Sequence, residues 1–403
     1  MDGIAVARAL TSAGVGGSAP GAVQPRADPA GASAFSIAAA LPQDDDAIRR
    51  LLRESPFGND VALSLEREPD SRLAASIEGD DHLSLVARHR SGVVAGIASR
   101  AVRRVFVNGT VTRIGYLGQL RIDPRFRTHR ELLARGFDAI NQMRHQDGVR
   151  LHLAAVVADN VAARRLLARR VRGWPIFQPV DTLVSLAIPV GAGGRGRPRD
   201  LECRRGSLDD LDDIVGCLEQ HARRSQFSPA WSRADLLSAA RSRNLHLEDF
   251  AVARRDDRVI GCVACWDQRP FKQAVVRGYA PRLARWRPVV NLLAPLTGTP
   301  YLPPVGATLD FAYLSHLAPG RGDTADPSLA IALVRAALAA AARRGLRYVV
   351  LGLSASHPLF PELRRPFSHR AYESVLYAVF WPEDEALAAA LDGRPSHPEL
   401  AIL

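Results

Sequence analysis

The sequence has a single lysine, Lys272, among its 403 residues, so arginine carries almost all of the positive charge. Lysine and arginine total 53 against 42 acidic residues, which gives a formal net charge of +11. A basic excess favours anionic partners, but the arginines are scattered and aromatic residues make up only 6%. The sequence shows no aromatic stacking platform or nucleic-acid reading motif. We therefore expect no nucleic-acid partner, and the arginine bias indicates a GC-rich genome as much as a function.

Cysteine is scarce as well, with four residues. Cys262 and Cys265 have the spacing of a metal-binding pair, but they occur alone, inside a strand pattern that turns their thiols to opposite faces of a sheet. Buried thiols in a reducing compartment are the expectation. We expect no disulfide and no metal site.

Long apolar runs are also missing, since none approaches the roughly 18 residues that a membrane span needs. The first ten residues hold a short apolar run that Arg8 interrupts, without the basic start of a secretory signal. We therefore expect a cytoplasmic protein with no membrane partner. The 47% hydrophobic and 24% charged residues are typical of globular domains.

The most informative stretch comprises residues 115–160, which read as strand, basic turn, helix, strand and helix start. Residues 115–123 are extended and largely apolar, and Pro124 ends them. A helix begins at Glu131, because apolar side chains recur from there at 3.6-residue spacing. A second apolar strand, 149–157, follows it.

The turn before this helix carries Arg125, Arg127 and Arg130. A helix N-terminus has unpaired N–H groups at the positive end of its dipole, and guanidinium groups suit phosphate oxygens. The turn therefore has the chemistry of a diphosphate site, without the glycine motif of a P-loop or a dinucleotide fold. The alternative is a solvated basic turn.

The order of these elements resembles the core of the GNAT superfamily, the acyl-CoA-dependent N-acyltransferases. Arg127 lies where the family's pyrophosphate loop, Arg/Gln-x-x-Gly-x-Gly/Ala, begins. Thr128, His129 and Arg130 replace the residues that follow, including the expected glycines.

The family's next helix often starts Asn-x-x-Ala-x-x-Leu, which Asn160, Ala163 and Leu166 match. Leu167 lies where many members have tyrosine. The resemblance therefore extends from the phosphate loop to the following helix and departs from the family at the expected catalytic acid.

Beyond the glycine-rich residues 191–199 the order of elements repeats. The resemblance implies an α/β (α+β) fold with two tandem GNAT-like domains, each a mixed, mostly antiparallel twisted sheet flanked by helices. The predicted boundaries are a disordered tail 1–34, an acyl-CoA-binding domain 35–190, a linker 191–199 and a degenerate, acceptor-recognising domain 200–403. The second domain carries an insertion of roughly 40 residues, Asp267 to Gly306, of the length that is usually functional or disordered.

Acetyl-CoA or another acyl-CoA is the co-substrate that the resemblance implies, with no metal. The backbone of residues 120–122 would pair with pantetheine, and Asn160 is suited equally to the cofactor and to capping its own helix. The cofactor-binding residues expected on this basis are Leu120, Arg121, Ile122, Arg125, Arg127, Thr128, His129, Arg130 and Asn160.

The sequence is least informative about catalysis, which requires a base for the amine and an acid for the leaving thiolate. The weak candidates are Asp123, Glu131, His316 and Tyr372. The preferred hypothesis is an N-acyltransferase, most simply an N-acetyltransferase, that transfers its acyl group directly to a small-molecule or peptide amine in a ternary complex. The alternative is a catalytically lapsed acyl-CoA-binding or interaction protein.

Overall fold

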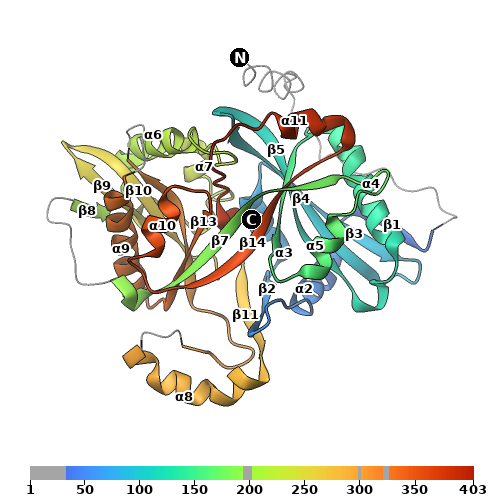
Figure 1. Cartoon of the computed structure of the whole chain (residues 1–403), viewed down its shortest axis with the longest axis horizontal. Coiled ribbons are helices and arrows are strands. Elements are labelled where there is room, and N and C mark those ends of the chain that lie inside the picture. The colour runs from blue at the N-terminus through green and yellow to red at the C-terminus, as the bar shows by residue number, and fades with distance from the viewer. Residues whose placement is uncertain (1–32, 194–201, 298–300, 321–325) are drawn as a thin grey trace.

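The computed structural model describes residues 33–193, 202–297, 301–320 and 326–403. The predicted disordered tail lies almost entirely outside these residues, and so does most of the predicted linker. Within the described part of the chain, twelve strands form one sheet and two more strands pair separately. We refer to the predicted domains 35–190 and 200–403 as the first and second halves of the molecule. Helices pack on both faces of the sheet in each half (Figure 1).

The strands of the sheet, in their order across it, are β1 (Phe35–Ala39), β3 (Asp81–His89), β4 (Val94–Val107), β5 (Thr110–Ile122), β6 (His152–Val157), β14 (Arg370–Phe380), β7 (Ile176–Pro189), β13 (Tyr348–Ser354), β12 (Phe311–Pro319), β10 (Arg258–Trp266), β9 (Phe250–Arg255) and β8 (Glu202–Arg205). The separate pair consists of β2 (Val61–Glu66) and β11 (Gln273–Tyr279). The α-helices are α2 (Asp45–Arg53), α3 (Ser71–Glu78), α4 (Arg130–Asp147), α5 (Val161–Leu167), α6 (Leu211–Ala222), α7 (Arg233–Leu237), α8 (Pro281–Thr297), α9 (Pro327–Arg343), α10 (Leu359–Arg364) and α11 (Glu385–Ala389).

Among the described strand pairs, β5–β6 and β12–β13 are parallel and all others are antiparallel. The predicted mixed, mostly antiparallel sheet flanked by helices is therefore confirmed. Local signals agree with it. Asn108 and Gly109 join β4 to β5 with φ angles of 51° and 78°, as a two-residue Asn-Gly hairpin requires. Gly148, with φ 71°, ends α4.

The last strands of the two halves are exchanged. β14, from the C-terminal end of the chain, lies between β6 and β7 and pairs with both. β7, from the first half, pairs on its other side with β13 of the second half. In Figure 1 these strands cross the middle of the molecule side by side. The sheet thus passes the predicted domain boundary without a break, and the division into two domains stays a prediction.

The exchange reaches into the hydrophobic cores. Val184, Leu186 and Ile188 of β7 pack in the core of the second half, against α9 and β13. Leu376 and Phe380 of β14 pack in a core of the first half, with residues of β4, β5 and β6. Each such side chain contributes roughly 1.5–3 kcal/mol on burial. Each half is therefore stabilised by a strand that the other half supplies.

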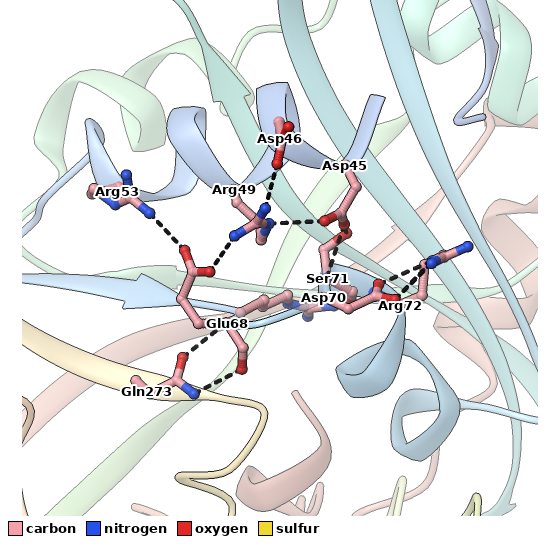
Figure 2. Close-up of polar contacts among 10 residues, drawn as sticks. Asp45, Asp46, Arg49, Arg53, Glu68, Asp70, Ser71, Arg72 and Gln273 are labelled. Atoms are coloured by element: carbon pink, nitrogen blue, oxygen red, sulfur yellow. Dashed lines mark hydrogen bonds and ion pairs between the residues drawn. The ribbon is translucent and has the colours of Figure 1, made fainter. Parts of the chain in front are cut away.

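A second connection joins β2 of the first half to β11, which belongs to the insertion of the second half. Figure 2 shows the polar contacts that surround it. The backbone N–H of Glu68 donates to Gln273 Oε1 at 2.9 Å, and Gln273 Nε2 donates to the Glu68 carbonyl at 3.0 Å. The Glu68 carboxylate accepts hydrogen bonds from Arg49 and Arg53 of α2. These bonds fix the insertion against the first half.

The cysteines are free thiols, and three of the four are buried. Cys262 packs in one core cluster and Cys265 in another, on opposite faces of β10, as their spacing predicted. No helix among the described residues is both long enough and apolar enough to cross a membrane.

Candidate functional site

β5 and β6 run parallel for only a short distance. Gly115 pairs with His152 and Tyr116 with Leu153, and beyond these pairs the strands part. β6 continues beside β14, whereas β5 follows β4. A cavity of ≈ 990 Å³ occupies the opening, with α4 and α5 in its lining. Its volume is at the upper end of the range for small-molecule sites, roughly 300–1,000 Å³.

A β-bulge in β5 borders this cavity. Ile97 of β4 pairs with Arg121, and Ser99, two residues later, pairs with Gly118, so that β5 carries one extra residue. Gln119 at the bulge has a φ of 53°, a left-handed value that is uncommon outside glycine. Strained residues of this kind cluster at ligand sites. The bulge interrupts the β4–β5 ladder at residues that line the cavity.

The N-terminus of α4 lacks a side-chain cap. Its N-cap residue is His129, which makes no capping hydrogen bond. The His129 ring instead packs against Phe35 and Phe126, with ring centroids 5.2 and 6.1 Å apart. The helix has 18 residues, so its dipole is fully developed at this end. An uncapped helix start beside a cavity is a suitable anion site.

The three arginines of the turn have different surroundings. Arg127 lines the cavity, where its Nε donates to the Ile122 carbonyl at 3.4 Å. Arg125 is bound to Asp123 through Nε at 3.0 Å and Nη2 at 2.7 Å, and it does not line the cavity. Arg130 is the exposed first residue of α4. Arg127 is therefore the arginine of this turn that lies at the cavity.

The other predicted cofactor residues divide in the same way. Leu120, Arg121 and Ile122 line the cavity, and Thr128 and His129 do not. Asn160 lines it too, and its side chain accepts the Ala163 N–H at 3.1 Å, which caps α5. Asn160 therefore caps α5 and also lines the cavity, so its role as a cap is compatible with the proposed contact to a cofactor.

The inner end of the cavity is polar and buried. Glu78, at the end of α3, is 2% exposed and forms an ion pair with Arg67, and His82 Nε2 lies 3.1 Å from a carboxylate oxygen of Glu78. Burial alone would raise the pKa of Glu78, but Arg67 and the bond from His82 outweigh it and hold that pKa well below its usual value. Glu78 is therefore an anion in a mostly apolar cavity.

The single lysine of the chain belongs to the same region. Lys272 is 6% exposed, lines the cavity and donates to the carbonyl oxygens of Leu403 at 2.8 Å and Ala401 at 3.3 Å. Burial lowers its pKa to about 8. Lys272 comes from the insertion of the second half, so both halves contribute to the cavity.

Tyr116 lies where β5 and β6 part. It is 8% exposed and lines the cavity, and the Ala155 backbone N–H hydrogen-bonds its phenolic oxygen. Burial raises the pKa of Tyr116 to about 12, although the nearby Arg103 acts in the opposite direction. The phenol is therefore neutral at pH 7 and holds a proton that it can donate.

The second half repeats this geometry. Tyr313 pairs with Val350 in the parallel pair β12–β13, as Tyr116 pairs with Leu153 in β5–β6. Three residues after each tyrosine the backbone turns left-handed, with φ 53° at Gln119 and 55° at His316. The two halves therefore contain the same bulged strand beside a parallel partner.

In the second half, the chain itself occupies the position next to the bulge. The N–H of His316 donates to Glu399 Oε2 at 2.8 Å. Leu400 packs so closely on Gly352 of β13 that a Cβ at this glycine would lie 2.4 Å from the Leu400 Cβ. Residues 399–402 thus lie against both β12 and β13. The bulge of the first half faces a cavity, and that of the second half faces a carboxylate of the protein.

None of the four predicted catalytic candidates lines the cavity. Asp123 binds Arg125, which lowers the pKa of Asp123 to about 2. Glu131 is exposed and pairs with Arg135 at 3.0 Å. His316 is buried against the rings of Trp231, Phe250 and Trp266, and Tyr372 lies on β14 with 44% of its surface exposed.

Sequence reasoning did not assign a role to Tyr116, Glu78 or Lys272. Only Lys272 carried a signal, as the single lysine of the chain and a member of the long insertion. The sequence does not reveal that Tyr116 lies at the parting of two strands, or that Glu78 reaches the same cavity from α3.

No family model matches the chain, and no curated protein matches its sequence. Solved structures do match its fold. A GCN5-related N-acetyltransferase from Sphaerobacter thermophilus is similar over 92% of this chain and 99% of its own, with 16% identity and a TM-score of 0.55. Yeast (Saccharomyces cerevisiae) N-myristoyltransferase with bound myristoyl-CoA is similar over 90% of this chain and 87% of its own, with 12% identity and a TM-score of 0.55.

The glucosamine N-acetyltransferase region of a fungal multi-domain GH3 β-N-acetylglucosaminidase is also similar, over 88% of this chain and 39% of its own, with 14% identity and a TM-score of 0.60. Identities this low establish a common fold and nothing further. The chain has the fold of the GCN5-related N-acetyltransferase (GNAT) superfamily, as its sequence predicted.

Proposed function

We propose that this protein is an acyl-CoA-dependent N-acyltransferase whose acyl-CoA site is the cavity between β5 and β6. The observation that carries the proposal is that one cavity joins an arginine beside an uncapped helix N-terminus to a buried carboxylate, past the point where two parallel strands part. The arginine and the helix N-terminus suit a diphosphate, and the buried carboxylate suits an ammonium group. The similar fold of a structure that contains myristoyl-CoA supports the choice of an acyl-CoA.

In this proposal Arg127 and the first turn of α4 bind the diphosphate. The pantetheine arm lies along β5, where the bulge at Gln119 leaves backbone groups free to pair with its amides. The thioester then lies near Tyr116. The ammonium form of the acceptor first loses a proton to water. As the neutral amine attacks the thioester carbonyl and the C–S bond breaks, the Tyr116 hydroxyl supplies a proton to the leaving thiolate, and the proton that the new amide nitrogen loses restores the phenol.

The acceptor would enter from the inner end, which the insertion of the second half helps to form. The anionic Glu78 attracts the ammonium group of a small-molecule or peptide amine, and Arg67, Arg121 and Lys272 give the same region several positive charges. An acceptor that carries both an amine and an anionic group fits this arrangement. Transfer takes place directly between the two substrates, without an acyl-enzyme.

A second candidate function is acyl-CoA binding without catalysis. It is favoured by Leu167, an apolar residue that lines the cavity at the position where many members of the superfamily have tyrosine. Titration with acetyl-CoA and a panel of amines separates the two functions, because a catalyst releases free CoA and a binding protein does not. Binding without thiol release above background, over a broad amine panel, would support the second candidate. Absence of any CoA binding would contradict both.

A further inference from the structure

Three histidines come together in the second half, outside the cavity lining. His221 is in the last turn of α6, His357 follows β13, and His397 belongs to the segment after α11. One potential ligand nitrogen from each lies within 4.8 Å of those of the other two. Their ring centroids are 5.6, 5.4 and 4.7 Å apart. The tertiary fold thus brings three imidazoles from distant parts of the sequence to one point.

These side chains are buried, and two of their nitrogens lack partners. His221, His357 and His397 are 5%, 3% and 8% exposed. His221 Nε2 and His397 Nδ1 have no hydrogen-bond partner among the described residues. A buried polar atom without a partner is rare in folded proteins and destabilises them. Two such atoms in one cluster indicate that the cluster binds something that the polypeptide does not supply.

We propose that His221, His357 and His397 bind one divalent transition-metal ion of the zinc class, with a water molecule as fourth ligand. Three imidazoles and a water form a familiar tetrahedral zinc site, and imidazole suits first-row transition metals in general. This departs from the sequence-based expectation of no metal, because the three histidines have no motif spacing along the chain.

His357 would exchange a hydrogen bond for the ion. Its Nδ1 accepts the backbone N–H of Leu359 at 3.2 Å. A neutral imidazole has only one nitrogen with a free lone pair, so coordination through either nitrogen removes this acceptor. The ion therefore competes with a weak hydrogen bond of the protein.

The position of the cluster gives the ion a structural role. His397 is joined to the segment before α7 by its N–H, which donates to the Gln226 carbonyl at 2.8 Å, and by its carbonyl, which accepts from Ser228 at 3.0 Å. Two residues later, Glu399 holds the bulge of β12. A metal ion at His397 would fix this C-terminal segment to α6 and to the end of β13.

The test uses untagged full-length protein, because a histidine tag would bind metal by itself. The protein is dialysed against a chelator and then titrated with Zn²⁺ or Co²⁺. We expect about one ion per chain by elemental analysis, ligand-field bands of tetrahedral Co²⁺, and a rise in Tm of roughly 3 °C at 100-fold excess over the dissociation constant.

The variants His357→Ala and His397→Ala should each lose the bound ion, the Co²⁺ bands and the metal-dependent rise in Tm. His316→Ala is the matched control, because it also removes a buried imidazole with an unpartnered Nε2 but leaves the cluster intact. We expect this control to melt earlier and still bind one ion.

Two outcomes overturn the proposal. One is wild-type protein that takes up no ion and shows no change in Tm, a measurement that does not depend on whether any variant folds. The other is uptake that persists in both cluster variants, which places the ion elsewhere.

Discussion

Replacement of Arg127 by alanine is the most direct test of the acyl-CoA site. Arg127 lines the cavity beside an uncapped helix start, and the hydrogen bond from its Nε to the Ile122 carbonyl is long, at 3.4 Å. A hydrogen bond between charged groups contributes roughly 1.5–3 kcal/mol, and each 1.4 kcal/mol is about tenfold in affinity. We therefore expect Arg127→Ala to weaken CoA binding about 10- to 150-fold.

Arg125→Ala is the matched control. This arginine lies two residues away and has the same charge, but its guanidinium group is already bound to Asp123 by two hydrogen bonds. We expect its removal to change the CoA dissociation constant less than twofold. Isothermal titration with CoA at two salt concentrations measures both variants, and the loss for Arg127→Ala should shrink as salt rises. Equal losses for the two variants, or none for Arg127→Ala, would refute the assignment of the diphosphate to this turn.

Three further predictions concern catalysis, the buried ion pair and pH. Tyr116→Phe should lower kcat, measured as thiol release, about 10²-fold and leave the CoA affinity unchanged. An unchanged kcat would remove Tyr116 from the mechanism. Glu78→Gln should lower the free energy of unfolding by roughly 3–5 kcal/mol, because it leaves the charge of Arg67 buried without its partner. In urea unfolding, the double variant with Arg67→Gln should lose less stability than the sum of the two single variants, and strict additivity would contradict the coupling. Burial raises the pKa of Glu399 to about 6, above its ordinary value of 4.5, so this group stabilises the fold most below pH 4.5 and loses its contribution as the pH rises through 6. The difference in unfolding free energy between wild type and Glu399→Gln should therefore fall between pH 4.5 and 6, and a flat difference would show that Glu399 is not perturbed.

Much of the fold follows from local patterns. The apolar spacing from Glu131 and the turn at Gly148 predict α4 to within a residue, and Asn108-Gly109 predicts the hairpin of β4 and β5. These features depend on neighbours in sequence. The partner of β2 is β11, some two hundred residues further along the chain, and nothing in Val61–Glu66 indicates this pairing. The exchange of β7 and β14 is non-local in the same way.

The sequence reached the lining of the candidate site where this depends on the backbone and not where it depends on side-chain direction. Residues 120–122, Arg127 and Asn160 line the cavity, and their binding of a cofactor stays a prediction. Arg125 does not, because the backbone turn at Asp123 brings its guanidinium group onto the carboxylate. Tyr116 is an ordinary strand residue by pattern, and it acquires a possible role only because two strands separate beside it.

The position of β14 has a consequence for how the protein is made. Before β14 has been synthesised, β6 has no neighbour on one side and β7 can pair only with β13. The sheet beside the cavity therefore becomes continuous only after β14 has been made. A nascent or shortened chain that ends before Arg370 exposes an unpaired strand edge to other proteins, so neither half contains all the strands that its own part of the sheet needs.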